Sequence, residues 1–404
     1  MSVKNRFFGG ILLVAGTTIG AGMIGIPVKT AAAGFYPTLA AFGIVWTLMT
    51  ISALLFLEAS LCFPGESNFI SMAGATLGKA GKAVAWFANL FYMYSMMAAY
   101  TSGGVTMIIE LCPMHIILAM FIYLFPFALA MYLGAKWVDL VNRFLTIGLI
   151  VSFIALCVST LFGAHSLQPV ANLSTVGSVH VLIVALPLLV TTFGYHIIIP
   201  SLKSYLEEDV PILKKTILIG SAIPFVVYVI WQLVILLLVP VFGDESLVTM
   251  LSANKNPGDS ITGYLLKYNQ NKWVLVFFSS FVFCALTSSL IGVAWSLGDF
   301  FADGFKIAKN SVGKLILGAL TFMPAIVYTL IFPQGFLKAL VLAGLCSVII
   351  MIVLPALMAY KLRCTPVTDQ KLVKYMVPIN KMLVGMVVLF GVVVVILECI
   401  NQLK

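Results

Sequence analysis

The sequence predicts an all-α polytopic membrane protein, and three observations carry the prediction. Hydrophobic residues fill 62% of the 404 positions, charged residues fill only 9%, and the mean hydropathy is +1.12. A soluble domain is about 45–50% apolar and about 25% charged, so this chain lacks the polar residues to coat a water-soluble core. The apolar residues form long runs, and runs such as Met382–Leu397 lack the alternation of a membrane β-strand. Lipid is therefore the predicted solvent for most of the surface.

Eleven apolar runs reach roughly the 20 residues that a bilayer-crossing helix needs. Charged or turn-rich segments separate these runs. The first run is interrupted at Gly16–Thr18, unlike the core of a cleaved signal peptide, so we expect it to be retained as a span. The predicted spans lie near residues 7–29, 35–62, 83–109, 116–134, 142–163, 179–201, 214–241, 273–300, 315–332, 336–360 and 381–400.

The basic residues predict the orientation of the chain, because lysine and arginine are retained on the cytoplasmic side during insertion. With a cytoplasmic N-terminus, 17 of the 23 basic residues fall inside. The six left outside are Lys29, Lys255, Lys267, Lys272, Lys338 and Lys404. An odd number of spans then places the C-terminus outside. This distribution accounts for the net charge of +9 without a nucleic-acid partner.

The first and sixth spans share a motif that apolarity alone does not require. Thr17-Thr18-Ile19-Gly20 is followed by Pro27, and Thr191-Thr192-Phe193-Gly194 is followed by Pro200. Glycine and proline weaken a helix in the membrane unless protein or a water-filled cavity satisfies the freed backbone groups. Paired interrupted spans in two halves of a chain indicate the binding site of a secondary transporter. The alternative is close helix packing through Gly16-x-x-x-Gly20.

The two motifs lie five spans apart, so the two halves must cross the membrane in opposite directions. This predicts a leucine-transporter-like 5+5 inverted repeat plus an eleventh transmembrane helix. A single membrane transport domain would cover 1–404, with the first inverted repeat at 7–163, the second at 179–360 and the extra helix at 381–400. The ends of a broken helix offer both bare N–H groups and bare carbonyls, which suit the carboxylate and ammonium of an amino acid.

Several motifs together resemble the bacterial hydroxy/aromatic amino acid permease family: Gly16–Pro27, Thr192–His196, Gly220–Pro224 and Ser289–Ala294. The resemblance extends over essentially the whole chain. It implies a multi-pass importer of the bacterial cell inner membrane, a symporter that carries an aromatic amino acid with an ion, usually a proton. Tyrosine is the first expected substrate. Permeases for tryptophan or for serine and threonine are the alternatives, since they would share the backbone site and differ in the side-chain pocket.

The resemblance also implies a substrate site in the two broken spans. The N–H groups of Ala21 and Gly22 would bind the carboxylate. The carbonyls of Thr18, Phe193 and Gly194 would bind the ammonium. The neighbouring residues included in this predicted site are Thr17, Gly20 and Tyr195, the last of which stands where a phenylalanine is expected.

The third span offers Tyr94, Tyr100 and Thr101 as walls for an aromatic substrate. Tyr94 and Thr101 are seven residues apart and hence share a helix face. An aromatic ligand favours aromatic neighbours with ring centroids about 4.5–7 Å away. Ordinary packing is the alternative for each tyrosine.

Residues of the eighth span are candidates for ion coupling. Ala285, Ser288 and Ser289 share one face of a helix. In sodium-coupled relatives of the wider fold, similarly placed residues bind sodium together with carbonyls that correspond to those of Gly16 and Ile19. The alternative is that the serines bond back into their own helix, so proton and sodium coupling both stay open.

Two ionisable residues within spans are further coupling candidates, because such residues are costly in a membrane. His196 lies in the broken sixth span, and an ordinary pKa of about 6.5 suits proton transfer. Its alternative is a structural histidine. Glu58 lies near the cytoplasmic end of the second span and is expected either to pair with a basic inner loop or to carry a proton.

Acidic residues at the inner ends of the spans are expected to act outside the substrate site. Asp299 is predicted to close an inner gate with Arg143 or Lys306. The acidic trio Glu207–Asp209 is predicted to be a solvated loop.

Other classes of membrane protein find little support. An enzyme would need a catalytic constellation, and the sequence contains no HExxH, GxSxG or GxxxxGK[ST] motif. A channel would need repeated charged or polar rows along a pore. The seven cysteines form no CxxC or Cys/His cluster, so neither a metal nor a cofactor is predicted. The expected partners are the amino acid, the coupled proton or sodium ion, and lipid, with no obligatory protein partner.

Overall fold

The computed structural model describes residues 3–63, 68–162, 179–253, 255–268, 271–364 and 381–402. Every regular element within these ranges is a helix, which confirms the predicted all-α class. The helices are α1 Val3–Thr18, α2 Gly22–Thr30, η1 Ala31–Ala33, α3 Phe35–Leu61, α4 Phe69–Leu111, α5 Ile116–Leu133, α6 Ala135–Phe162, α7 Val179–Thr192, η4 His196–Ile198, α8 Ile199–Tyr205, α9 Val210–Leu238, α10 Leu247–Ser252, α11 Pro257–Tyr268, α12 Lys272–Phe305, α13 Ser311–Ile331, α14 Phe336–Val348, η5 Ile349–Val353, α15 Leu354–Cys364 and α16 Lys381–Gln402.

Each of the eleven predicted runs coincides with helix. Among the described residues, eight helices are long and apolar enough to cross a membrane, and the bent pair α1–α2 makes a ninth span. The other two predicted spans lie in α4 and α16. α4 has 43 residues and bends at Gly78, whose φ of 76° interrupts the helix. The apolar helix described within α16 is Val384–Glu398.

Side chains fix where several helices begin. A side chain at the N-cap accepts a hydrogen bond from a backbone N–H that has no partner inside the helix. Such caps begin helices at both ends of the bundle, so the loops are specified locally. The capping residues are Asn68, His115, Asp209, Ser246, Asn271 and Asn310.

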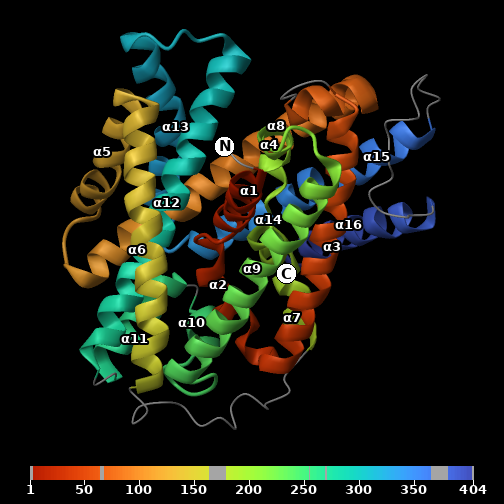
Figure 1. Ribbon diagram of the computed structural model, residues 1–404. Helices are drawn as coiled ribbons and strands as arrows, with labels where there is room; N and C mark the ends of the chain where they lie inside the picture. The colour runs from red at the N-terminus through yellow and green to blue at the C-terminus, as the bar shows by residue number, and fades with distance from the viewer. Residues whose placement is uncertain are drawn as a thin grey trace.

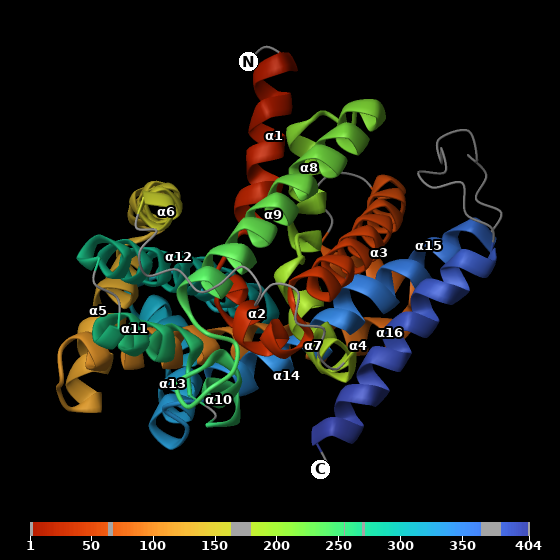
Figure 2. The same ribbon diagram turned by 90° about the horizontal axis from the view of Figure 1, so that it is seen from below.

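The helices pack in reciprocal pairs (Figures 1 and 2). α6, the fifth span, packs along α12, the eighth span. α14, in the tenth span, packs along α4, the third span. Each pairing becomes the other when the two halves of five spans are exchanged. This is the arrangement that an inverted repeat requires, while the boundaries 7–163 and 179–360 stay a prediction. α1 packs along α9, and α2 packs against α7.

The tenth span contains a π-helical segment, η5, between α14 and α15. A π-helical turn holds an extra residue and leaves the regular ladder of hydrogen bonds. The hydroxyl of Ser52 on α3 donates to the carbonyl of Met351 in this segment. The Met351 Sδ atom lies only 2.6 Å from where a Cβ on Gly194 would stand. The irregular part of the tenth span thus abuts the irregular part of the sixth.

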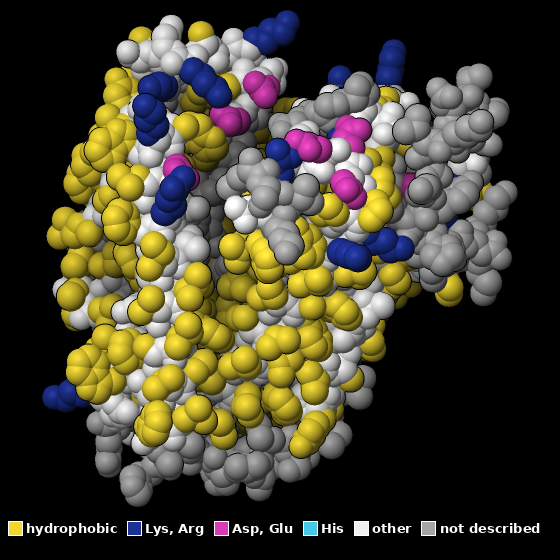
Figure 3. Space-filling model, viewed as in Figure 1, with side chains coloured by type: hydrophobic (Ala, Val, Ile, Leu, Met, Phe, Trp, Pro, Cys, Tyr) yellow, Lys and Arg dark blue, Asp and Glu magenta, His cyan; other side chains and the backbone are white. Residues whose placement is uncertain are grey.

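Charged side chains gather at one end of the molecule (Figure 3). On the face shown, Lys, Arg, Asp and Glu cluster at the end where α1 begins, above a broad apolar band. α10 and α11 lie at the opposite end (Figure 1). The predicted orientation requires such a distribution. Three basic residues that enter this prediction, Lys371, Lys374 and Lys404, lie outside the described residues.

Candidate functional site

The first span is broken where the Thr-Thr-x-Gly motif predicts. The helix axis bends by 54° between residues 5–18 and 22–33. The N–H of Met23 donates to the carbonyl of Gly20 at 3.2 Å, and that of Ile24 donates to Ala21 at 3.1 Å, so α2 starts with tight turns. The end of α1 and the start of α2 therefore meet inside the protein, with carbonyls on one side and N–H groups on the other.

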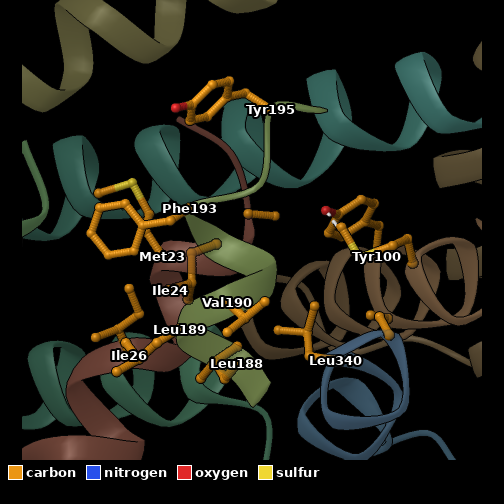
Figure 4. Packing of buried hydrophobic residues seen from close by; sticks show 14 of the residues in the cluster. Met23, Ile24, Ile26, Tyr100, Leu188, Leu189, Val190, Phe193, Tyr195 and Leu340 are labelled. Carbon is orange, nitrogen blue, oxygen red and sulfur yellow. Dashed lines mark hydrogen bonds between the residues drawn. The ribbon is translucent and has the colours of Figure 1, made fainter. Parts of the chain in front are cut away.

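The sixth span is broken at the corresponding motif. α7 ends at Thr192, and the N–H of Gly194 donates to the carbonyl of Thr191 at 3.1 Å. The chain then passes through η4 into α8, which has Pro200 near its start. The two breaks lie against each other, since a Cβ on Gly22 would be 3.0 Å from the Thr192 hydroxyl. Figure 4 shows side chains of α2 and α7 packed together, with Tyr100 of α4 facing them.

The threonine pairs bond within their own helices. The hydroxyls of Thr17 and Thr18 donate to carbonyls one turn earlier in α1, both at 2.7 Å. Those of Thr191 and Thr192 do the same in α7, at 3.0 and 2.7 Å. Such back-bonding weakens and bends a helix. The hydroxyls of the duplicated threonines therefore weaken α1 and α7 where these helices end. The backbone carbonyls of these threonines, and not their hydroxyls, face the site.

Tyr228 on α9 connects the two breaks. Its hydroxyl lies 2.6 Å from the carbonyl oxygen of Thr18 and 2.9 Å from that of Thr192. The ring is fully buried and packs edge-on against Phe193, with centroids 5.0 Å apart. One turn further along α9, the Trp231 indole N–H donates to the carbonyl of Met23 at 2.9 Å. α9 therefore positions the end of α1, the start of α2 and the end of α7 together.

Sequence reasoning missed Tyr228 and Trp231. Both lie in an apolar run that was interpreted only as a span. A tyrosine and a tryptophan three residues apart in mid-membrane each carry a donor that must find an acceptor. Broken helices elsewhere in the chain offer such acceptors, and this was the available signal.

The predicted ion-coupling residues of α12 are only partly brought to the break. The Ser289 hydroxyl accepts a hydrogen bond from the N–H of Ala21 at 3.2 Å. The Ser288 hydroxyl instead donates to the carbonyl of Ala285 at 3.3 Å, which is the back-bonding alternative. A Cβ on Gly16 would meet nothing within 4 Å, so close helix packing does not explain this glycine. The carbonyl of Ile19 lies in the bent segment.

The predicted aromatic walls separate into two groups. Tyr100 is buried and points from α4 toward the broken helices (Figure 4). Thr101 is also buried, and its hydroxyl has no hydrogen-bond partner among the described residues. Tyr94 faces elsewhere, since its hydroxyl donates to the carbonyl of Leu320 on α13 at 2.8 Å. Tyr195 is buried and leaves the break in a different direction from Phe193 (Figure 4).

The two buried ionisable candidates have different surroundings. Glu58 is 2% exposed and forms a bidentate ion pair with Arg363, with both N–O distances 2.6 Å. This supports the predicted structural pair. His196 is also buried, stacks on Phe56 with centroids 6.5 Å apart and lies beside Tyr195. Neither ring nitrogen has a hydrogen-bond partner within the described ranges.

The predicted inner gate is paired differently from the expectation. Arg143 bonds to Asp139, one turn earlier on the exposed face of α6, at 2.8 Å. Lys306 takes a left-handed conformation, φ 55°, at the end of α12 and turns the chain back. Lys309 then reaches Asp299 at 2.7 Å. In this structure Asp299 is thus paired with Lys309, and an inner gate formed by Asp299 with Arg143 or Lys306 stays a prediction.

The acidic trio 207–209 is exposed in a turn, as predicted for a solvated loop, and each member also has a partner. Glu207 pairs with Arg6 of α1. Glu208 lies 3.6 Å from the buried ammonium of Lys203. Asp209 caps α9 by accepting from a backbone N–H at 3.0 Å. Glu207 and Glu208 hold left-handed φ angles of 54° and 59°, which turn the chain sharply between α8 and α9.

Comparison with known proteins places this geometry in a family. The model of the tryptophan/tyrosine permease family matches residues 3–398. The chain belongs to this family. It is 32% identical to tyrosine-specific transport system 1 of Haemophilus influenzae, over 89% of each chain. It is 29% identical to the tryptophan-specific transport protein of that organism, over 96% of this chain and 94% of the relative. The low affinity tryptophan permease of Escherichia coli K12 is 30% identical, over 97% and 95%.

This membership in the permease family confirms the resemblance seen in the sequence and makes the chain a multi-pass protein of the bacterial inner membrane. A solved structure supports the fold. The crystal structure of a manganese transporter from Eremococcus coleocola matches 98% of this chain and 86% of its own, with a TM-score of 0.64 and 15% identity. The predicted leucine-transporter-like architecture is therefore present in this permease.

Substitution of Gly22 tests whether the contact between the two breaks is required. We expect Gly22→Val to reduce uptake at least tenfold, because even the first added carbon meets the Thr192 hydroxyl at 3.0 Å. The matched control is Gly16→Ala, whose added carbon meets nothing within 4 Å. Transport assays on cells with equal amounts of inserted protein make the comparison. Normal uptake by Gly22→Val would contradict this placement.

Removing the hydroxyl of Tyr228 tests the connection between the breaks. Tyr228→Phe leaves the carbonyls of Thr18 and Thr192 without their shared donor, which costs about 1–3 kcal/mol for a buried acceptor. We expect a Tm decrease of the purified protein and at least a tenfold loss of uptake. Tyr94→Phe is the control, since it removes a hydroxyl bonded to Leu320, away from the breaks. Equal effects of the two substitutions would refute a special role for Tyr228.

Proposed function

We propose that this permease is a secondary active importer of an aromatic amino acid, with tyrosine as the first candidate, coupled to proton entry. The N-terminus lies in the cytoplasm and the C-terminus in the periplasm. The observation that carries the proposal is the meeting of two broken helices at one buried hydroxyl, Tyr228. Members of the family are transport proteins, so no catalytic residue enters the proposal.

The chemistry of the breaks suits an amino acid. The carbonyls of Thr18 and Thr192 converge on one donor, and a substrate ammonium is a stronger donor than the Tyr228 hydroxyl. On the α2 side of the first break, the N–H of Ala21 donates a hydrogen bond to the Ser289 hydroxyl, and a substrate carboxylate can replace that hydroxyl as the acceptor. The start of α2 adds the partial positive charge of a helix N-terminus. Both ends of a zwitterion are therefore accommodated at the first break.

The aromatic side chain of the substrate has candidate neighbours. Tyr100, Phe193 and Tyr228 come from three different elements and surround the breaks, and Phe42 packs edge-on against Phe193 at 6.1 Å. The relatives named above are specific for tryptophan or tyrosine by name, which favours an aromatic substrate over serine or threonine. Tyrosine is placed first because of the sequence resemblance.

His196 is the proposed proton carrier within the sixth span. It is 3% exposed, and its two ring nitrogens have no partner in the described part of the chain. A structural histidine would be expected to use at least one of them. The residue directly follows the break, where a change in substrate binding can reach it. The sodium alternative through Ser288 and Ser289 requires exchange of the bonds that they now make.

Uptake into proteoliposomes tests the proposal. Vesicles holding the full chain receive labelled tyrosine or tryptophan under an imposed inward proton gradient or an inward sodium gradient. We expect accumulation with the proton gradient and efficient competition by the other aromatic amino acid, but not by serine. Vesicles without protein are the control. Uptake that neither gradient changes would sink the symport proposal, and preference for serine would move the substrate to another class.

Substitution of His196 tests the proton route. We expect His196→Gln to flatten the dependence of uptake on external pH, because the amide keeps the size of the ring but cannot titrate. The measurement is initial uptake between pH 5.5 and 8, normalised to the amount of inserted protein. His115, at the exposed N-cap of α5, gives the matched control His115→Asn. An unchanged pH profile in His196→Gln would leave a structural role only.

A further inference from the structure

The loop between α9 and α12 forms a helical cap over the end of the bundle that lies opposite the N-terminus. α10 and α11 pack against α2, and α11 also packs against α4 and α12. Asn256, just before α11, connects the cap to two other elements. Its amide group donates to Thr106 of α4 at 2.7 Å, and its side-chain oxygen accepts from the N–H of Phe336, the first residue of α14, at 3.1 Å. Its own N–H donates to the side chain of Gln334 at 2.6 Å.

Asp259, in the first turn of α11, is buried beneath this cap. It is 6% exposed, and neither carboxyl oxygen has a hydrogen-bond partner with good geometry among the described residues. The carboxyl lines a cavity of about 10 Å³ together with Ile24, Gly103, Leu286 and Phe336. Asn256 also lines the cavity, and the side chains of Thr106 and Gln334 lie near the carboxyl; these polar groups are neutral, and the other neighbours are backbone or hydrocarbon. The burial of an ionised carboxylate in such surroundings is costly, and the usual outcome is that the group takes up a proton.

The cavity lies next to the candidate substrate site. Ile24 follows Gly22 by two residues on α2, Leu286 precedes Ser289 by three on α12, and Gly103 follows Tyr100 by three on α4. One helical turn on each of these elements therefore separates the cap carboxyl from the groups at the breaks. Gly258 fits tightly here, since a Cβ on it would be 3.0 Å from Val282. Closing the cap necessarily places Asp259 against the outer side of the site.

We propose that Asp259 is a proton-binding site of the outer gate, and that the cap formed by α10 and α11 closes over the substrate site only when this carboxyl has taken a proton from the outside solution. The proposal rests on the proposed function for its outside direction and deepens it. It assigns an entry point for the coupled proton that is distinct from His196.

The direction of the effect follows from the surroundings of the carboxyl. Burial raises the pKa of Asp259 to about 8, and the negative charge of Glu110 on α4 acts in the same direction. The neutral polar side chains of Thr106, Asn256 and Gln334 lower this pKa, but they do not offset the effect of burial. The side chains facing it from α2, α12 and α14 are Ile24, Leu286 and Phe336, which carry no charge. In an open cap the pKa returns to its ordinary value of about 4. Closure therefore takes up one proton between about pH 4 and pH 8, and it becomes less favourable by up to about tenfold per pH unit as the pH rises through that window.

A buried thiol under the cap can report closure without any substrate. Thr262 is fully buried on α11, and its hydroxyl bonds only within the helix, to Gly258 at 2.7 Å. Thr262→Cys is introduced into the full chain with the exposed Cys62 and Cys112 changed to serine. The rate of modification by a maleimide is measured in detergent from pH 5.5 to 7.5. Each rate is divided by the rate of a small thiol at the same pH, which removes the pH dependence of the maleimide reaction itself. The rate of the protein without Thr262→Cys is subtracted to remove the contribution of the other cysteines.

We expect the corrected rate to rise at least tenfold over this pH range, because the cap opens as Asp259 loses its proton. Asp259→Asn should stay at the low, pH-independent rate, and Asp259→Glu should keep a rise. Asp244→Asn, which removes an exposed carboxylate from the same loop, is the matched control and should behave as the parent. If the protein that carries Thr262→Cys and keeps Asp259 shows a rate that does not change with pH, the proposal is overturned, even if every Asp259 variant fails to fold. A parent-like rise in Asp259→Asn also overturns it.

A transport assay separates this proposal from the proposed function. Exchange of labelled tyrosine against internal tyrosine at equal pH requires recognition but no net proton movement. We expect Asp259→Asn to retain exchange and to lose at least tenfold of the accumulation driven by a proton gradient. Absence of exchange in the parent protein would contradict the proposed substrate, while the thiol profile would still decide the role of Asp259. Full accumulation by Asp259→Asn would overturn that role.

Discussion

The structure depends on one buried hydroxyl that holds two broken helices together. A break in a membrane helix exposes carbonyls that no water can satisfy, and each would be costly if left alone. Tyr228 places a single O–H between the carbonyls of Thr18 and Thr192, so one hydroxyl serves as hydrogen-bond donor to both breaks. Trp231 secures the far side of the first break through Met23. Because both donors belong to α9, that helix determines how the two breaks lie relative to each other.

The two ends of the bundle differ in a way that fits alternating access. At the end opposite the N-terminus, Asn256 connects the cap to α4 and α14, and the carboxyl of Asp259 is enclosed. Toward the other end, Gly16 and Thr17 are exposed although they lie within the first span. The face in Figure 3 is hollowed between α6 and the α1–α9 pair. The structure thus combines a closed cap with an open approach to the first break from the side of the N-terminus.

The sequence predicted the helices and the breaks because both depend on local properties. Long apolar runs specify spans, and the repeated Thr-Thr-x-Gly motif specifies where two of them fail. It could not predict the role of Tyr228, because this depends on which helices pack beside α9. The pairing of Asp299 with Lys309 depends on the left-handed turn at Lys306, which brings the chain back to the end of α12. The sequence gives no indication that Asp259 is buried, since nothing near it predicts that α11 folds inward. The exposure of the acidic trio 207–209 agrees with the predicted solvated loop, but its ion-pair partners, Arg6 on α1 and Lys203 on α8, were not predicted.

The π-helical segment of the tenth span gives the bundle torsional freedom at the level of the sixth-span break. We expect α14 to turn more easily about its axis than α15, because the regular ladder of hydrogen bonds is already interrupted between them. α15 is held by the ion pair of Arg363 with Glu58, whereas α14 begins at Phe336 under the cap. If the cap moves as proposed, we expect the movement to reach α14 and to be taken up near Met351, beside Gly194. The proposed gate would then act without displacing α15.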